Sequence, residues 1–219
     1  MYRSTPARTG TALVGVLAAV TLTAGCGVAT EEPVTPEAKP VPVATLKTAL
    51  LATTDLPAGF TVTPDDSSSP AAPITGDCAE LANEADPAEF TESTKASLAR
   101  ETQTAFHGVS HQLASGATAG ITAAVARLRD SIAKCKSFTQ DLDGTKMEVT
   151  VTPETAPQLG DEAIAATLTR VVDGVTLISR LVVVRQGNVV SALDVGGTTE
   201  DKALIDQAVQ KATAKLQKL

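Results

Sequence analysis

Three runs rich in β-branched and aliphatic residues follow one another between residues 162 and 195. Two pairs of turn residues, Asp173-Gly174 and Gly187-Asn188, separate them. Such pairs form two-residue hairpins because their backbones reach positive φ at little cost. The pattern therefore predicts three adjacent antiparallel strands, which need a further layer packed against them to be stable.

Two other segments place apolar residues at the spacing of an amphipathic helix. The apolar stripe of the first, over residues 118–138, consists of Ile121, Val125, Leu128, Ile132 and Cys135. The second follows Gly196-Gly197, which are expected to end the sheet at a turn. Its inward residues are Leu204, Ile205, Ala208, Val209, Ala212, Leu216 and Leu219. Weaker patterns predict short helices over 43–53 and 77–83 and strands over 60–63, 96–102, 108–114 and 146–151. The expected fold class is α+β: an antiparallel sheet with the long helix and the C-terminal helix packed against one face.

The two hairpins fix the register of the three strands, so that Thr167 lies opposite Arg180, and Arg180 opposite Val195. One face is then uniformly aliphatic and is expected to carry the helices: Ile164, Ala166, Leu168, Leu177, Leu181, Val183 and Ala192. The other face mixes aliphatic, hydroxyl and cationic groups: Ala165, Thr167, Thr169, Ile178, Arg180, Val182, Ser191 and Leu193.

A mixed face of this kind suits the wall of a cleft that binds an anionic or polar ligand. Its candidate ligand-binding residues are Arg180, Thr167, Thr169 and Ser191. The alternative is that Arg180 simply pairs with an acidic residue near the edge of the sheet.

The N-terminus has the features of an export signal: two arginines, an apolar run from Thr11 to Leu22, and small residues before Cys26. As a helix the apolar run would extend about 18 Å, which is short of a ~30 Å membrane core. Small residues ending in Cys resemble the bacterial lipobox, in which that Cys receives acyl chains such as palmitate. The Leu usual three residues before the Cys is replaced by Thr23. Secretion without lipid and an uncleaved anchor are the alternatives.

The expected organisation is therefore a signal peptide over residues 1–25, a lipidated Cys26 with a Pro-rich tether over 26–42, and one folded domain over 43–219. Four prolines in the tether favour an extended chain, which would hold the domain away from the membrane. The formal charge of −7 and an aromatic content of 2% with no Trp exclude a nucleic-acid-binding protein, which needs cationic surface and stacking rings.

The cysteines and histidines give the candidate chemistry. With Cys26 lipidated, Cys78 and Cys135 remain as a pair in an oxidising compartment, and we expect them to form a structural disulfide. A metal site needs more ligands, and a redox pair is normally two residues apart.

The only two histidines, His107 and His111, could share a face, but a zinc site needs a third ligand. Ser110 would point away from His111 on a strand, which disfavours a hydrolase. Polar structural histidines are expected, with a metal site or a general base as the alternatives.

Several stretches together resemble the PknH-like extracellular sensor domain of actinobacteria. They are Leu50 to Phe60 (LLATTDLPAGF), Leu159 to Ala163 (LGDEA) and Val182 to Val190 (VVVRQGNVV), besides the lipobox, the tether and the two cysteines. The family occurs outside a mycobacterial serine/threonine kinase and in free lipoproteins. The resemblance implies an antiparallel sheet with helices, disulfide support, a cleft and ligand sensing without catalysis. One cysteine pair replaces the family's two disulfides, and no kinase domain is attached.

The predicted function is a non-catalytic sensor or small-ligand-binding domain, lipid-anchored through Cys26 to the outer side of the cell membrane. No catalytic residue, cofactor or metal is expected. Its partner would be an unknown small ligand, or, as the alternative function, an envelope protein that it binds as an interaction scaffold.

Overall fold

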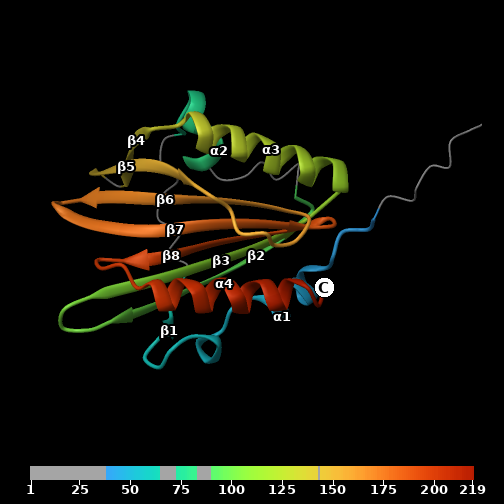
Figure 1. The fold of residues 1–219 in the computed structure, drawn as a ribbon, viewed down its shortest axis with the longest axis horizontal. Coiled ribbons are helices and arrows are strands. Elements are labelled where there is room, and N and C mark those ends of the chain that lie inside the picture. The colour runs from blue at the N-terminus through green and yellow to red at the C-terminus, as the bar shows by residue number, and fades with distance from the viewer. Residues whose placement is uncertain (1–37, 65–72, 83–89, 143) are drawn as a thin grey trace, which may run out of the picture. The chain divides into compact units, whose positions relative to one another are not determined.

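A computed structural model describes residues 38–64, 73–82, 90–142 and 144–219. The predicted signal peptide, Cys26 and most of the tether lie outside these ranges. The described chain forms a single antiparallel sheet with the strand order β1-β2-β3-β8-β7-β6-β5-β4 (Figure 1).

The strands are β1 Thr61–Val62, β2 Glu92–Glu101, β3 Phe106–Ser115, β4 Ser137–Leu142, β5 Thr145–Glu154, β6 Glu162–Val172, β7 Val175–Gln186 and β8 Val189–Gly197. The helices are α1 Val43–Ala49, α2 Ala79–Ala82, α3 Thr118–Lys134 and α4 Lys202–Leu216, with 3₁₀ turns at Thr53–Asp55 and Gly76–Cys78. The predicted α+β class with an antiparallel sheet is confirmed.

The three-strand meander has the predicted register. Thr167 is paired with Arg180, and Arg180 with Val195. At the first turn Asp173 and Gly174 have φ values of 47° and 78°, and at the second Gly187 has a φ of 59°. The turn residues thus adopt the left-handed backbone that made them recognisable in the sequence.

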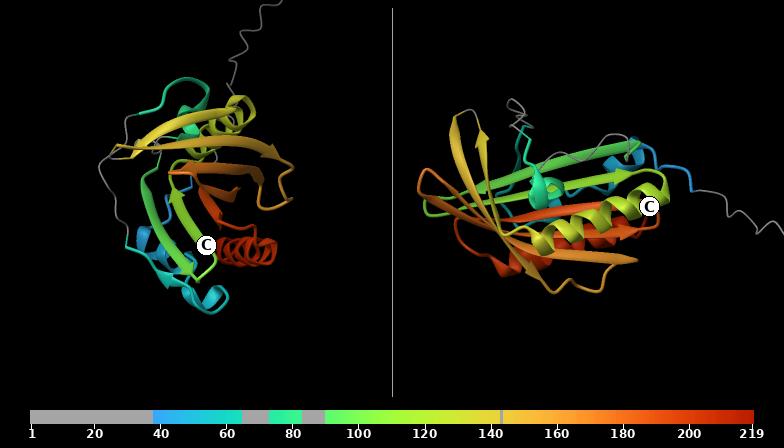
Figure 2. Two further views of the ribbon diagram at one scale, coloured as in Figure 1. Left: turned by 90° about the vertical axis from the view of Figure 1, so that its left-hand side faces the viewer. Right: turned by 90° about the horizontal axis from the view of Figure 1, so that it is seen from above.

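The two long helices pack against opposite faces of the sheet, and the prediction of a single covered face was wrong in this detail. Ile121 and Val125 of α3 share a core cluster with Val183, whereas Leu216 of α4 shares one with Val182. Consecutive strand residues point to opposite faces, so the helices enclose the sheet between them. In Figure 1 strands β6–β8 lie between α3 and α4, and Figure 2 shows how strongly the sheet twists.

The mixed face of the meander, which contains Arg180 and Val182, is apolar where α4 crosses it. Val182 and Leu193 are each 2% exposed there, and β3 adds Val109 and Leu113 to the same side. The pattern of residues 162–195 covers three strands only, and the neighbouring strand β3 supplies the aliphatic side chains that complete this second core.

Two boundaries also differ from the sequence prediction. The helix predicted to reach Phe138 ends at Lys134, because Cys135 has an extended backbone (ψ 124°), and residues 137–142 then form edge strand β4. Gly196 and Gly197 lie within β8 and not in a turn. A Cβ on Gly196 would lie 2.1 Å from the carbonyl oxygen of Ile178, so glycine is needed there for the close approach of β7 and β8.

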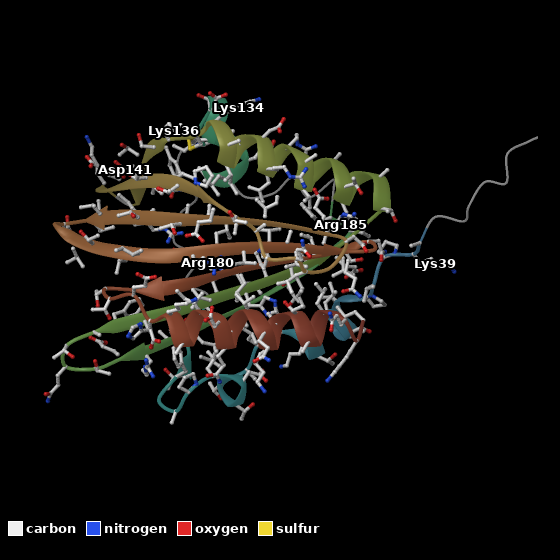
Figure 3. All side chains as sticks on the ribbon, viewed as in Figure 1. Lys39, Lys134, Lys136, Asp141, Arg180 and Arg185 are labelled. Atoms are coloured by element: carbon white, nitrogen blue, oxygen red, sulfur yellow. A yellow bond between two sulfur atoms is a disulfide. The ribbon has the colours of Figure 1, made fainter. Side chains whose placement is uncertain are left out.

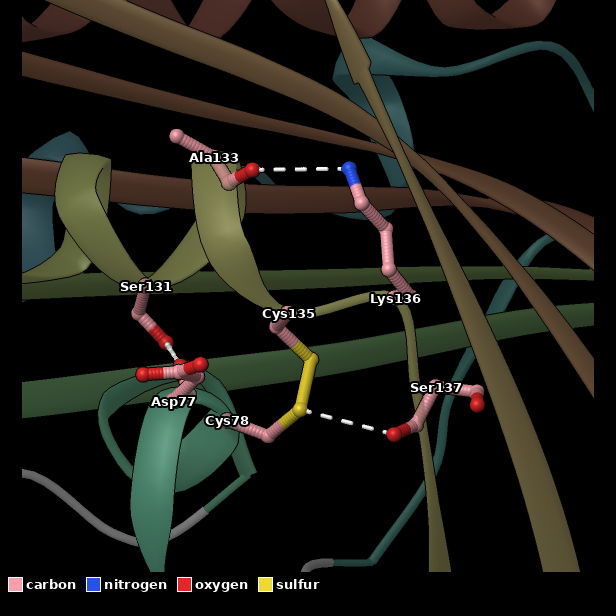
Figure 4. The surroundings of a disulfide bond; sticks show 7 residues. All are labelled: Asp77, Cys78, Ser131, Ala133, Cys135, Lys136 and Ser137. Carbon is pink, nitrogen blue, oxygen red and sulfur yellow. Dashed lines mark hydrogen bonds between the residues drawn. A yellow bond between two sulfur atoms is a disulfide. The ribbon is translucent and has the colours of Figure 1, made fainter.

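The predicted disulfide between Cys78 and Cys135 is present, with an S–S distance of 2.05 Å (Figure 4). It joins the 3₁₀ turn at residues 76–78 to the end of α3. The hydroxyl of Ser131 donates a hydrogen bond to the carbonyl oxygen of Asp77, so the turn is fastened to α3 by two contacts. The bond therefore fixes the short α2 segment above a helix that the sheet already holds.

Candidate ligand-binding pocket

A surface pocket of about 230 Å³ lies on the α4 side of the sheet, beside the N-terminal turn of α4. Strands β5, β6 and β7 form its floor, and the residues around the start of α4 form its rim. It is lined by Glu154, Thr167, Ile178, Ser179, Arg180, Glu200, Lys202 and Ile205. Two of the four predicted ligand-binding residues, Thr167 and Arg180, therefore lie in one pocket.

Arg180, which projects from the middle of β7 (Figure 3), has an acidic neighbour. Its Nε lies 2.8 Å from Oε2 of Glu154, and the Thr167 hydroxyl donates a hydrogen bond to the other oxygen of that carboxylate. The acidic partner that the alternative predicted is thus present. Arg180 donates no hydrogen bond to a described residue: its buried Nε meets Glu154 as an ion pair without a hydrogen bond, and the side chain remains 26% exposed.

The other two predicted residues do not join the pocket. Thr169 lies on β6 but is not among the lining residues. Ser191 is 3% exposed, and its Oγ lies 3.0 Å from Nε2 of His111 in the core. The within-strand pattern placed Ser191 on the correct face, but it could not show that α4 and the N-terminal segment cover that part of the face.

His111 is fully buried and has a structural role that the sequence did not reveal. Its Nδ1 accepts a hydrogen bond of 3.0 Å from the backbone N–H of Leu51, so in the neutral ring the proton is on Nε2, which donates to Ser191. Burial, reinforced by the positive charge of Lys215 and opposed by Asp55, lowers the pKa of His111 from 6.5 to about 4. The ring is therefore neutral at physiological pH and attaches the N-terminal segment to the sheet.

The same N-terminal segment is bound by α4. The Nζ of Lys215 donates to the carbonyl oxygen of Leu50 (2.7 Å) and to Oδ2 of Asp55 (2.6 Å), and the side-chain amide of Gln207 donates to the carbonyl oxygen of Asp55. Burial alone would raise the pKa of the Asp55 carboxyl. The hydrogen bonds from Lys215 and from the Ala52 N–H, together with the lysine charge, hold that pKa below its usual value.

His107 is also buried, at 6% exposed, and its Nδ1 has no hydrogen-bond partner in the described ranges. It lies two strand repeats from His111, on the same face of β3, while Ser110 lies on the other face. Among the residues that the structure describes, no group of three His, Cys, Asp or Glu side chains could hold a metal ion.

The motif Leu159 to Ala163 has a structural explanation. Gly160 has a φ of 59°, and a Cβ there would lie 2.4 Å from the carbonyl oxygen of Arg185. The carboxylate of Asp161 accepts hydrogen bonds from the backbone N–H of Gly187 and from Arg185, and Glu162 pairs with Arg185. These contacts bind the loop before β6 to the β7–β8 hairpin, next to the end of the tether at Lys39 (Figure 3).

Comparison with models of protein families and with curated protein sequences gives no match. Comparison with solved structures gives the extracellular domain of PknH from Mycobacterium tuberculosis, at a TM-score of 0.60 and 14% sequence identity. The chain shares the fold of the PknH extracellular domain. The likeness covers 82% of this chain and 97% of the PknH domain.

This likeness confirms the fold expected from the motifs. The motifs themselves now have assigned places: Leu50 to Phe60 is the segment that His111 and Lys215 hold, and Val182 to Val190 contains the second hairpin. None of the described helices is long and apolar enough to cross a membrane.

Proposed function

We propose that the protein is a lipid-anchored domain on the outer side of the cell membrane that binds a small ligand and catalyses no reaction. The export signal and lipobox-like Cys26 support the location. The fold supports it as well, because PknH uses the same fold in an extracellular domain.

The proposal depends most on how the guanidinium group of Arg180 is placed and which of its nitrogens have partners. Its Nε forms an ion pair with Glu154, while the terminal nitrogens donate no hydrogen bond to a described residue and lie at the wall of a pocket. A guanidinium group fixed in this way is preorganised to bind an oxyanion through two parallel hydrogen bonds.

The contacts of His111 favour a binding role over a catalytic one. His111 donates and accepts inside the core, so neither ring nitrogen is available to a substrate. Ser110, the nearest hydroxyl in sequence, is on the opposite face of the strand. A general base needs to reach a bound substrate, and His111 does not.

Native mass spectrometry of the protein purified from its own envelope tests the proposal. We expect a co-purifying mass that is reduced in Arg180→Gln and retained in Lys146→Gln, an exposed lysine on β5 that serves as the matched control. A single apo mass in wild type, with a specific envelope protein recovered by surface crosslinking, would instead support the interaction scaffold. Cys26→Ser should release the protein from the membrane fraction if Cys26 carries the anchor.

A further inference from the structure

We infer that the pocket binds a small zwitterion, an α-amino acid with an aliphatic side chain. This inference rests on the proposed function and names the ligand class for the same pocket. Three properties of the lining carry it: its balance of charge, its size and its apolar wall.

The charges around the pocket are balanced. Glu154 and Glu200 carry two negative charges, and Arg180 and Lys202 carry two positive charges. A ligand with only a carboxylate would meet both glutamates, and a ligand with only an ammonium would meet both cations. A molecule that carries both groups can place each one beside the opposite charge.

Some of these charges have partners in the protein, and the others are available to a ligand. Glu154 is engaged by Thr167 and Arg180, and Lys202 pairs with Asp206 through both carboxylate oxygens. Glu200 is exposed and makes no ion pair within the described ranges. The terminal nitrogens of Arg180 and the carboxylate of Glu200 are therefore the open groups, one for each end of a zwitterion.

The size and the apolar wall restrict the ligand further. A volume of about 230 Å³ is below the ~300–1,000 Å³ of most drug-sized sites. A pocket of this size suits a solute of amino-acid size better than a drug-sized molecule. The apolar wall is mainly Ile178, which is 37% exposed, with a small contribution from Ile205, which is only 7% exposed, and an aliphatic side chain would cover it.

Isothermal titration of the full-length protein in detergent with three matched probes tests the inference. Leucine carries both charged groups, 4-methylpentanoate lacks the ammonium, and 3-methylbutylamine lacks the carboxylate. We expect leucine to bind at least about tenfold more tightly than either partial analogue, since each charged hydrogen bond contributes about that factor.

Two variants assign the binding to the open groups. Arg180→Gln should weaken leucine binding by about tenfold or more, and Glu200→Gln should weaken it several-fold. Glu200 lies on the exposed rim, so its replacement tests the inference even if Arg180→Gln lowers the melting temperature. Lys146→Gln should leave leucine binding unchanged.

The outcomes separate the inference from the proposed function. Suppose that 4-methylpentanoate bound as tightly as leucine and that its binding depended on Arg180. The pocket would then bind a simple anion. The inference of a zwitterionic ligand would be wrong, but the proposed ligand-binding function would still be supported. If only an uncharged envelope component bound, and did so through Arg180, the zwitterionic ligand would again be wrong, and the proposed binding function would again be supported. If no probe and no component of an envelope extract showed Arg180-dependent binding, both would fail.

Discussion

The burial of His111 predicts a specific loss of stability in mild acid. In the folded protein its pKa is lowered from 6.5 to about 4, because protonation would place a charge in the core and an N–H opposite the Leu51 N–H. Between pH 6.5 and pH 4, His111 is therefore protonated in the unfolded chain but neutral in the folded chain. Stability is complete above pH 6.5, falls as the pH drops towards 4, and then levels off for this group.

The magnitude follows from the two pKa values. A difference of about 2.5 pH units corresponds to about 3 kcal/mol of unfolding free energy in total, and about 2 kcal/mol of it is lost by pH 5. Asp55 and Lys215 are the charged groups that act on His111, and the lowered pKa of Asp55 places its own titration below pH 3.8. The difference between wild type and a variant at residue 111 over pH 7 to pH 5 therefore isolates the contribution of His111.

The assay compares urea unfolding of wild type and His111→Gln at pH 7 and pH 5, followed by circular dichroism because the chain has no Trp. Glutamine can accept from Leu51 and donate to Ser191 but cannot titrate. We expect wild type to lose about 2 kcal/mol more than the variant between the two pH values. Equal losses, or an NMR titration that gives His111 a pKa near 6.5, would refute the reasoning.

Three further predictions follow from the packing. Cys78→Ala/Cys135→Ala should lower the unfolding free energy by about 4 kcal/mol on the chain-entropy estimate, and a loss below about 1 kcal/mol in urea titrations would contradict a stabilising bond. Gly160→Ala should cost more stability than Gly187→Ala, because both residues have a φ of 59° but only at Gly160 would a Cβ meet a carbonyl oxygen. Gly187→Ala should cost about 1–2 kcal/mol, and equal melting-temperature losses would show that backbone conformation alone decides. Asn188→Ala removes donors to the carbonyl oxygens of Lys39 and Gly116, so hydrogen exchange at the Val41 amide should accelerate, whereas an unchanged rate would show that Ser115 holds this segment by itself.

The three-strand meander was predictable from the sequence because residues close together in the chain determine its turns and its register. Asp173-Gly174 and Gly187-Asn188 fix both turns, and a two-residue turn leaves only one register for the strands on either side. The disulfide was predictable because the compartment and the count of cysteines left one pairing. In both cases few residues decide the outcome, and they can be read without knowing what packs above them.

The side of the sheet on which each helix lies was not predictable in the same way. It depends on which strands from distant parts of the sequence complete each face, as Leu113 of β3 does beside Ser191 of β8. Edge strand β4 was missed because residues 135–138 also continue the apolar spacing of α3. The role of His111 was hidden because its donor, the backbone N–H of Leu51, is 60 residues away and leaves no signal in side-chain types.

The position of the tether agrees with a pocket that stays accessible beside a membrane. The side chain of Asn188, in the β7–β8 turn, binds the carbonyl oxygen of Lys39, so the tether leaves the fold at that end of the sheet. Arg180 lies six residues before the end of β7 at Gln186, about 20 Å along the strand at ~3.3 Å per residue, and α4 begins farther still from the tether (Figure 1). If Cys26 carries the proposed anchor, the chain from the lipid joins the domain at the hairpin end and not beside Arg180. The point of attachment would then leave the proposed Arg180 pocket uncovered.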